Sequence, residues 1–262
     1  MFPTLFSANG IELHTWGLMV VTAFLAASLV ASVRAPRVGI EADKLVPMYL
    51  LVTFAGLVGA RLLHFAMADD PPRGGIASAF FDMGQGGYVF YGGAIGGILS
   101  GALYAAARGI PVLKLADVTA PTILLGQAIG RLGCFLAGCC YGQPTELPWG
   151  VRFPAGGLPP SDVDLHPTQL YEFAATSLMI GLLLAWRRVR PIYGLGLPIL
   201  GGLYGSWRIF NESLRGDGER GTVLDGLMTN GQMTSLILMG IAAAGEVALW
   251  RAGERRAAPT AG

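Results

Sequence analysis

The stretch LADVTAPTILLGQAIGRLGCFL, residues 115–136, decides the fold class of this chain of 262 residues. It has the length of about 20 residues that an α-helix needs to cross the apolar core of a bilayer. It nevertheless carries Arg131, and a charge inside a membrane span is costly and usually marks a site. All three cysteines of the chain, Cys134, Cys139 and Cys140, follow within nine residues of that arginine. We therefore interpret the stretch as a membrane span with a functional outer end.

The composition supports a membrane protein. The chain is 53% hydrophobic and only 13% charged, with a mean hydropathy of +0.53, whereas soluble domains carry about 25% charged residues. The net charge of +1 argues against a nucleic-acid partner. Apolar stretches near span length occur at 14–33, 45–67, 87–107, 115–136, 168–186, 193–210 and 232–250. We expect an all-α protein with seven transmembrane helices, a single membrane domain over 1–252 and a disordered cytoplasmic tail at 253–262.

The cations predict the orientation. Of 18 Lys and Arg residues, three lie inside spans, four lie in one set of alternate loops, and the rest lie in the opposite set. The majority set is Arg34, Arg37, Lys44, Arg108, Lys114, Arg187, Arg188, Arg190, Arg251, Arg255 and Arg256. Cytoplasmic loops are enriched in Lys and Arg, so we expect the N-terminus outside and the C-terminus in the cytoplasm.

The three intramembrane arginines are predicted to reach a similar depth near the outer surface. At a rise of about 1.5 Å per residue, Arg61 and Arg208 lie roughly 24 and 22 Å along spans that run outward. Arg131 lies in the outer half of its own span. Each could instead extend to the outer headgroups. Because a guanidinium donates paired hydrogen bonds to phosphate, we interpret the three as a phospholipid headgroup site.

Other polar positions have a functional and a structural interpretation. Glu212 follows Arg208 by four residues and so shares its helix face, either to orient it or as a structural ion pair. Asp117 lies at the inner end of its span, as a partner or cap. The glycines after Tyr91 allow close helix packing, and Gly92 and Gly93 could also let a lipid approach the backbone.

Seven stretches together resemble the bacterial prolipoprotein diacylglyceryl transferase family. They are HTWGLM (14–19), GARLL (59–63), YGGAIGG (91–97), DVTAP (117–121), GRLGCFLAGCCYG (130–142), HPTQLYE (166–172) and YGSWRIFNESLR (204–215). The resemblance implies a seven-span enzyme of the bacterial inner membrane. It would move the diacylglyceryl group of phosphatidylglycerol to the lipobox cysteine of a preprolipoprotein, forming a thioether and releasing glycerol-1-phosphate.

The resemblance also assigns residues. The family's essential arginines fall on Arg131 and Arg208, and its following glutamate falls on Glu212. With Tyr91, these are the catalytic candidates. The predicted substrate-binding residues are Arg61, Gly92, Gly93, Cys134, Gly142, His166, Trp16 and Asp117. His166 also suits a structural role at the start of its span. No cofactor and no metal is expected, and the partners are phosphatidylglycerol, the lipobox signal peptide and membrane lipids.

The chain departs from the family pattern at several positions. Tyr91 stands where the family has a histidine proposed as a base, and a phenol ordinarily keeps its proton at neutral pH. Cys134 stands where the family has an asparagine, and Trp16 stands where it has a tyrosine. The family's signature also has a Glu before a closing Trp-Gly, and the matching stretch of this chain, which ends at Gly142, lacks that Glu. These changes bear on the acceptor more than on the lipid.

The cysteines and the function keep alternatives open. The thiols could form a disulfide, serve as a covalent relay, or simply pack as small residues at a helix end. Metal binding has little support from sequence, since no histidine is placed beside them. The competing functions are a related enzyme with a different acceptor and, further away, a non-enzymatic lipid-binding or transport protein.

Overall fold

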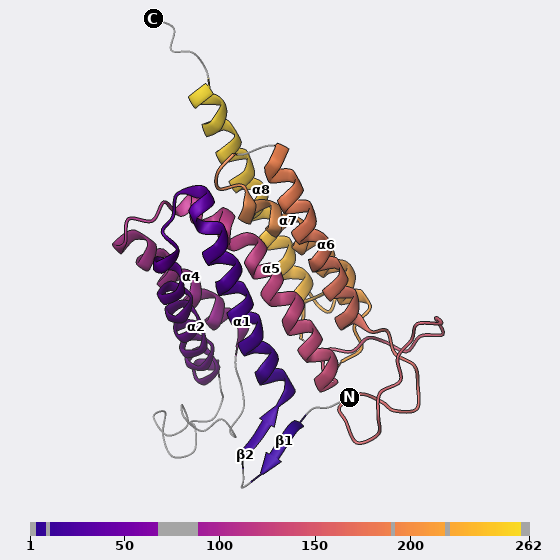
Figure 1. Ribbon diagram of the computed structural model, residues 1–262. Coiled ribbons are helices and arrows are strands. Elements are labelled where there is room, and N and C mark those ends of the chain that lie inside the picture. Colours follow the sequence, from indigo (N-terminus) through magenta and orange to yellow (C-terminus); the bar gives the residue numbers. More distant parts are fainter. Residues whose placement is uncertain (1–3, 9–10, 68–88, 190–191, 218–220, 258–262) are drawn as a thin grey trace, which may run out of the picture. The chain divides into compact units, whose positions relative to one another are not determined.

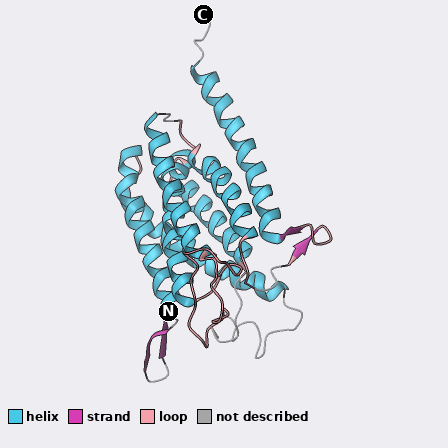
Figure 2. Cartoon of the chain, turned by 90° about the vertical axis from the view of Figure 1, so that its right-hand side faces the viewer, coloured by secondary structure: helices cyan, strands magenta, loops and turns pink. Residues whose placement is uncertain are grey.

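The computed structural model describes residues 4–8, 11–67, 89–189, 192–217 and 221–257. Helices dominate this part of the chain, and strands are confined to two short hairpins (Figures 1 and 2). The α-helices are α1 (Thr15–Arg34), α2 (Leu45–Met67), α4 (Phe90–Ala107), α5 (Val112–Ala137), α6 (Thr168–Val189), α7 (Gly196–Ser213) and α8 (Asn230–Ala257). The strands are β1 (Thr4–Ala8), β2 (Ile11–His14), β3 (Thr222–Val223) and β4 (Met228–Thr229).

Five helical segments are long and apolar enough to cross a membrane. They are Thr15–Val38, Ala42–Met67, Val112–Ala137, Thr168–Val189 and Asn230–Arg251. A mostly helical membrane protein is therefore confirmed, while the seven spans and their orientation stay predictions. Helix α8 continues to Ala257, into the tail expected to be disordered, and residues 258–262 of that tail lie outside the described part.

The chain divides into two compact units, residues 31–115 and the remainder. In the first unit, α2 packs against α4 through glycines. A Cβ added at Gly92 would lie 2.2 Å from the carbonyl oxygen of Gly59, and one at Gly59 would lie 2.4 Å from that of Gly92. One at Gly96 would lie 2.4 Å from the oxygen of Ala55. The two backbones are thus in direct contact, as small residues allow in membrane helices.

The second unit has an apolar core made by α5, α6 and α7. Its buried members come from all three helices and are Ala120, Leu124, Met179, Leu183 and Leu200. Helix α8 covers α7, where a Cβ at Gly205 would lie 2.5 Å from Met239 Cγ. Asn211 and Glu212 of α7 are buried in this unit, as expected for polar residues of a membrane helix that face the bundle interior.

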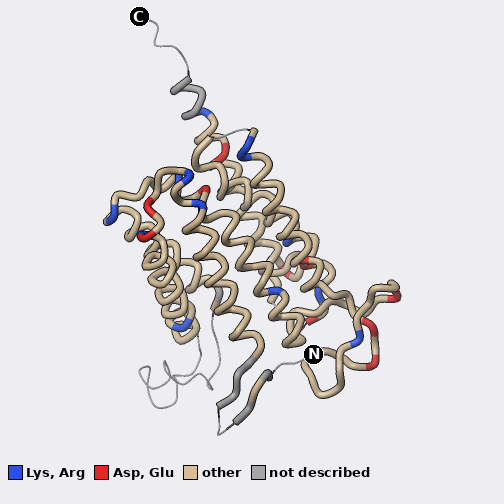
Figure 3. The backbone as a smooth tube through the Cα atoms, viewed as in Figure 1, with Lys and Arg blue, Asp and Glu red and all other residues tan. Residues whose placement is uncertain are grey.

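Asp117 joins three helices at one end of this core. The carboxylate of Asp117 is buried and accepts the backbone N–H groups of Gly194 at 3.0 Å and Gly196 at 2.9 Å, where α7 begins. It also pairs with Arg187 in the last turn of α6. Figure 3 shows where Lys and Arg (blue) and Asp and Glu (red) lie along the backbone. Anions are stabilised at a helix N-terminus, so Asp117 fixes the connection between α6 and α7.

The connection between α5 and α6, residues 138–167, is ordered by backbone bonds at Gly142. The Gly142 N–H donates to the His166 carbonyl at 2.9 Å, and Gln143 donates to the Leu214 carbonyl at 2.8 Å. A Cβ at Gly142 would lie 2.5 Å from His166 Cβ and 2.8 Å from the Leu214 oxygen. Only glycine fits, so this position ties the end of α5 to the start of α6 and the end of α7.

Candidate active site

A buried carboxylate, Glu172, lies between the two arginines that the sequence singled out in α5 and α7. Its Oε1 is 3.1 Å from Arg131 Nη2, and its Oε2 is 3.6 Å from Arg208 Nη1. The Glu172 side chain is fully buried, and both arginine side chains are 16% exposed. Since Glu172 comes from α6, one carboxylate holds cations from two other helices.

Neutral donors complete the surroundings of Glu172. Gln127 Nε2 and the Tyr204 hydroxyl donate to Oε1 at 2.7 and 2.8 Å, and Asn211 Nδ2 donates to Oε2 at 2.9 Å. A buried ion pair compensates for its loss of hydration only when the remaining lone pairs are also satisfied. Helices α5 and α7 therefore supply a nearly complete set of partners for the α6 carboxylate, which fixes where Glu172 and its arginines lie.

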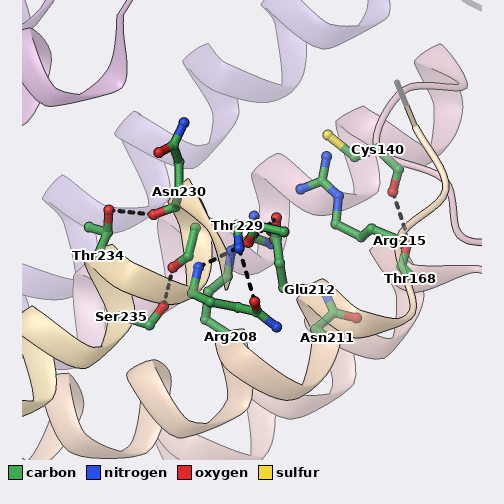
Figure 4. Close-up of polar contacts among 12 residues, drawn as sticks. Cys140, Thr168, Arg208, Asn211, Glu212, Arg215, Thr229, Asn230, Thr234 and Ser235 are labelled. Carbon is green, nitrogen blue, oxygen red and sulfur yellow. Dashed lines mark hydrogen bonds and ion pairs between the residues drawn. The ribbon is translucent and has the colours of Figure 1, made fainter. Parts of the chain in front are cut away.

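A second carboxylate holds Arg208 from its own helix. Glu212 Oε2 is 2.5 Å from Arg208 Nη2, and Thr229 donates to Glu212 Oε1 at 3.3 Å. Figure 4 shows Arg208, Glu212 and Thr229 directed toward one another. The Glu212 carboxylate also packs against Gly231, where an added Cβ would come within 3.1 Å of three of its atoms. Arg208 is thus fixed by α6 on one side and by its own helix and the start of α8 on the other.

The arginines retain donors that the protein does not use. A guanidinium has five N–H donors in a planar fork. Arg208 Nη1 is buried and has no hydrogen-bond acceptor within the described ranges. Arg131 meets Glu172 through Nη2 alone. Each arginine side chain is 16% exposed, and charge-assisted hydrogen bonds are the strong ones, so a phosphate could bind donors that do not face Glu172.

The three cysteines converge beside Arg131. All three are free thiols of intermediate exposure, and their sulfur atoms lie within 4.8 Å of one another. Cys140 lies outside the spanning segment, and hydrogen bonds from Cys134 and Cys139 lower the pKa of its thiol. The guanidinium groups of Arg215 and Arg131 act in the same direction, and Figure 4 shows Arg215 next to Cys140. Negative charge is therefore favoured on the Cys140 sulfur, whereas the neighbouring thiols and burial raise the pKa of Cys139.

The chain is similar to known proteins over most of its length. The family model for prolipoprotein diacylglyceryl transferase matches residues 3–248. The phosphatidylglycerol--prolipoprotein diacylglyceryl transferase of Clostridium tetani is 36% identical over 248 residues, which cover 92% of this chain and 96% of that protein. A second such transferase, of Clostridium perfringens, is 34% identical and covers 88% of each chain. That of Geobacter sulfurreducens is 31% identical and covers 91% of this chain and 92% of its own.

The chain belongs to the prolipoprotein diacylglyceryl transferase family. The predicted resemblance is confirmed. Within this member, the structure brings together Arg131, Arg208 and Glu212 of the catalytic candidates, with Cys134 one helical turn after Arg131. Their catalytic and substrate-binding roles remain predictions.

Two more predicted residues, Gly142 and His166, lie in the connection between α5 and α6. Gly142 makes the backbone junction described above. His166 contributes its carbonyl to that junction, and its Nδ1 lies 3.1 Å from the Tyr171 hydroxyl, which accepts from Trp149 Nε1 at 2.8 Å. These contacts hold His166 within the loop, and its predicted substrate-binding role stays a prediction.

Four predicted residues lie in the α2–α4 unit. Arg61 is buried, with its guanidinium carbon 4.9 Å from the centre of the Phe65 ring. Tyr91 is 44% exposed at the start of α4. Gly92 and Gly93 face α2, so helix packing gives a reason for both glycines that is independent of lipid. The predicted convergence of Arg61 with the other two arginines stays a prediction.

The last two predicted residues, Asp117 and Trp16, lie in the unit that contains Arg131 and Arg208. Asp117 is fourteen residues before Arg131 on α5, which is about 21 Å along a helix, and its oxygens bind α6 and α7. Trp16 is half exposed on α1, which meets α5 where a Cβ at Gly133 would lie 2.8 Å from Met19 Cβ. Asp117 therefore lies away from the arginine pair along α5, whereas the α1 turn that carries Trp16 packs close to it.

The sequence interpretation missed four members of the site: Glu172, Gln127, Tyr204 and Asn211. Glu172 was visible as an acid inside a predicted span, which is a functional candidate by itself. The sequence pattern assigns Glu172 only to the HPTQLYE motif (166–172). The other three are neutral, and nothing in a single sequence separates them from ordinary polar residues of a helix face.

Proposed function

We propose that this protein transfers the diacylglyceryl group of phosphatidylglycerol to the thiol of a lipobox cysteine in preprolipoproteins. A thioether forms and glycerol-1-phosphate leaves. The observation that carries the proposal is the pair Arg131 and Arg208, held around Glu172 in a chain of this transferase family. The comparisons do not favour the related enzyme with another acceptor or the lipid transporter.

The chemistry explains why two fixed arginines are useful. The acceptor thiolate attacks the glyceryl carbon that carries the phosphate ester, an S–C bond forms, and the C–O bond breaks with its electron pair on the departing phosphate. Negative charge therefore grows on glycerol-1-phosphate in the transition state. Preorganised cations in a site of low dielectric stabilise such charge without reorganising during the reaction.

The neighbouring acids have positioning roles in this scheme. Glu172 orients Arg131 and Arg208, and Glu212 fixes Arg208 from its own helix. Both carboxylates are already engaged by guanidinium groups and neutral donors. They are therefore poor candidates for a base that removes the thiol proton. Arg61 and Trp16 are proposed substrate contacts, and Tyr91, which stands at the position of the family's histidine, is a proposed catalytic residue.

We further propose seven spans with the N-terminus outside, in the bacterial inner membrane. The five apolar helices and the asymmetric Lys and Arg distribution support this orientation. Helices α4 and α7 would supply the two additional spans. Both have 18 residues, and each packs closely against a neighbouring helix through glycine.

The test is a transfer assay with a lipobox peptide in micelles that contain phosphatidylglycerol. Mass spectrometry should show the diacylglyceryl mass on the peptide cysteine with the wild type and not with Arg131→Ala. Arg152→Ala is the matched control, because Arg152 makes an exposed pair with Asp164 on the connecting loop. A wild type that leaves the peptide unmodified, under conditions where a transferase of a known relative acts, would overturn the proposal.

A further inference from the structure

The three-cysteine cluster is the part of the site that the reaction described above does not use. Cys134, Cys139 and Cys140 place three sulfur atoms within 4.8 Å of one another, each on a partly buried residue. Three thiolates bound to one zinc ion at about 2.3 Å each lie a little under 4 Å apart. The cluster needs only a small contraction to reach that spacing.

The backbone holds the thiols together in an unfavourable conformation. Cys140 has a φ of 62°, in the left-handed region that a residue with a Cβ rarely adopts. Its carbonyl accepts the Thr168 hydroxyl at 2.7 Å, and the Cys139 carbonyl accepts Gln169 Nε2 at 2.7 Å. The Cys139 N–H donates to the Cys134 carbonyl at 3.1 Å. Residues at the start of α6 therefore stabilise the turn that brings Cys140 toward the other two thiols.

Two arginines are electrostatic neighbours of the cysteine cluster. Arg131 precedes Cys134 by one helical turn, and Arg215 is an electrostatic neighbour of Cys140. Arg215 is itself paired with Asp217, at 2.8 Å between Nε and Oδ1. Three thiolates and one divalent ion carry a net charge of −1, which guanidinium groups at this position would stabilise.

We propose that Cys134, Cys139 and Cys140 bind a zinc ion whose fourth position takes the acceptor thiol of the substrate. This inference rests on the proposed transferase function. The sequence argued against a metal because no histidine accompanies the cysteines. Catalytic zinc sites, however, have three protein ligands and an open position. The convergence of three sulfur atoms one turn from Arg131 fits that pattern.

The metal would supply the thiolate that the reaction needs. A thiol that coordinates zinc loses its proton, which passes to water. The bound sulfur then attacks the glyceryl carbon, and the C–O electron pair leaves with glycerol-1-phosphate, so no oxidant or reductant is required. The carboxylates of Glu172 and Glu212 are already engaged by guanidinium groups, and a zinc-bound thiolate needs neither of them, nor Tyr91, as a base.

The first experiment measures zinc on the purified full chain in detergent, prepared with a thiol reductant and then freed of it without oxygen. We expect one zinc per chain in the wild type and in Arg131→Ala, and loss of bound zinc in Cys134→Ser and Cys140→Ser. Equal zinc in the serine variants would overturn the proposal. So would a wild type that binds none, or whose cysteines form a disulfide under these conditions.

The second experiment needs no variant that might misfold. Cobalt(II) replaces zinc in the wild type, and its sulfur-to-metal absorption reports the number of thiolates. A lipobox peptide should raise that absorption as a fourth thiolate binds, and the same peptide with serine in place of cysteine should not. An identical response to both peptides would overturn the open fourth position.

Transfer assays distinguish a failure of the zinc proposal from a failure of the transferase assignment. Removing zinc with a chelator should lower transfer roughly 100-fold, the lower range of what positioned proton transfer contributes, and zinc should restore it. Full transfer by protein that metal analysis shows to be free of zinc would overturn the metal proposal and keep the transferase. No transfer by the zinc-bound wild type would instead count against the transferase.

Discussion

The α2–α4 pair and the α5–α6–α7 group hold their helices together by different means. Both must hold helices together where lipid offers no hydrophobic gain for association. The first pair removes side chains, so that Gly59 and Gly92 bring backbone against backbone. The second group inserts charged and amide side chains around Glu172. The comparison indicates that close packing alone fixes the first interface, whereas the second adds buried charges to its apolar core, so the two should respond differently to substitution.

The strongest way to break the charged interface is Glu172→Gln. The substitution leaves Arg131 and Arg208 buried without their shared carboxylate, and removing one partner of a buried ion pair costs about 3–5 kcal/mol. We expect a large fall in thermal stability in detergent and loss of transfer. Glu146→Gln, at an exposed loop position, is the control. A Glu172→Gln protein with wild-type stability would show that Glu172 does not hold the helices together.

Asp117→Asn tests whether the other end of the same group is purely structural. The amide cannot pair with Arg187 or accept two backbone N–H groups as the carboxylate does. Hydrogen bonds to a charged group contribute about 1.5–3 kcal/mol, so we expect unfolding to become easier by about that amount. Transfer per folded molecule should be unchanged. A loss of transfer in fully folded protein would instead support the family-based assignment of Asp117 to the substrate.

Gly92→Ala breaks the glycine interface. The added Cβ would lie 2.2 Å from the Gly59 oxygen, so α2 and α4 must separate. Overpacking costs about 1–3 kcal/mol. Gly97→Ala is the control, because its Cβ would meet Val52 Cγ1 at an ordinary 3.5 Å. Thermal unfolding measures both. Unchanged stability with impaired lipid binding in Gly92→Ala would favour the lipid contact first predicted for this glycine.

The two regions also differ in how far the sequence predicted them. Glycine spacing around Gly92 and Gly96 predicted close packing, since a four-residue repeat places both on one helix face. The charges of Arg131 and Arg208 predicted a polar site, because cations in a span rarely face lipid. Their common partner Glu172 was not predicted, since which spans meet depends on tertiary packing.

The cysteine cluster could not be predicted from the spacing of the cysteines in the sequence, because it depends on backbone angles. Cys134 and Cys139 are five residues apart, and the helix that carries the first ends before the second. Whether their thiols meet is decided by the positive φ of Gly138 and Cys140. Those angles are stabilised by α6 side chains that lie almost thirty residues later, so the local sequence could only leave the alternatives open.

The smallest effect is expected at the side-chain hydrogen bonds between the connecting loop and Tyr171 of α6. Tyr171→Phe removes the hydroxyl that accepts from Trp149 Nε1 at 2.8 Å and meets His166 Nδ1 at 3.1 Å. A hydrogen bond of this kind contributes about 1 kcal/mol, so the unfolding temperature should fall slightly and transfer should persist. Because the Gly142 junction uses only backbone groups of His166, it should survive this change. If Tyr171→Phe abolished transfer in folded protein, the His166–Tyr171 pair would belong to the reacting groups and not to the scaffold of the loop.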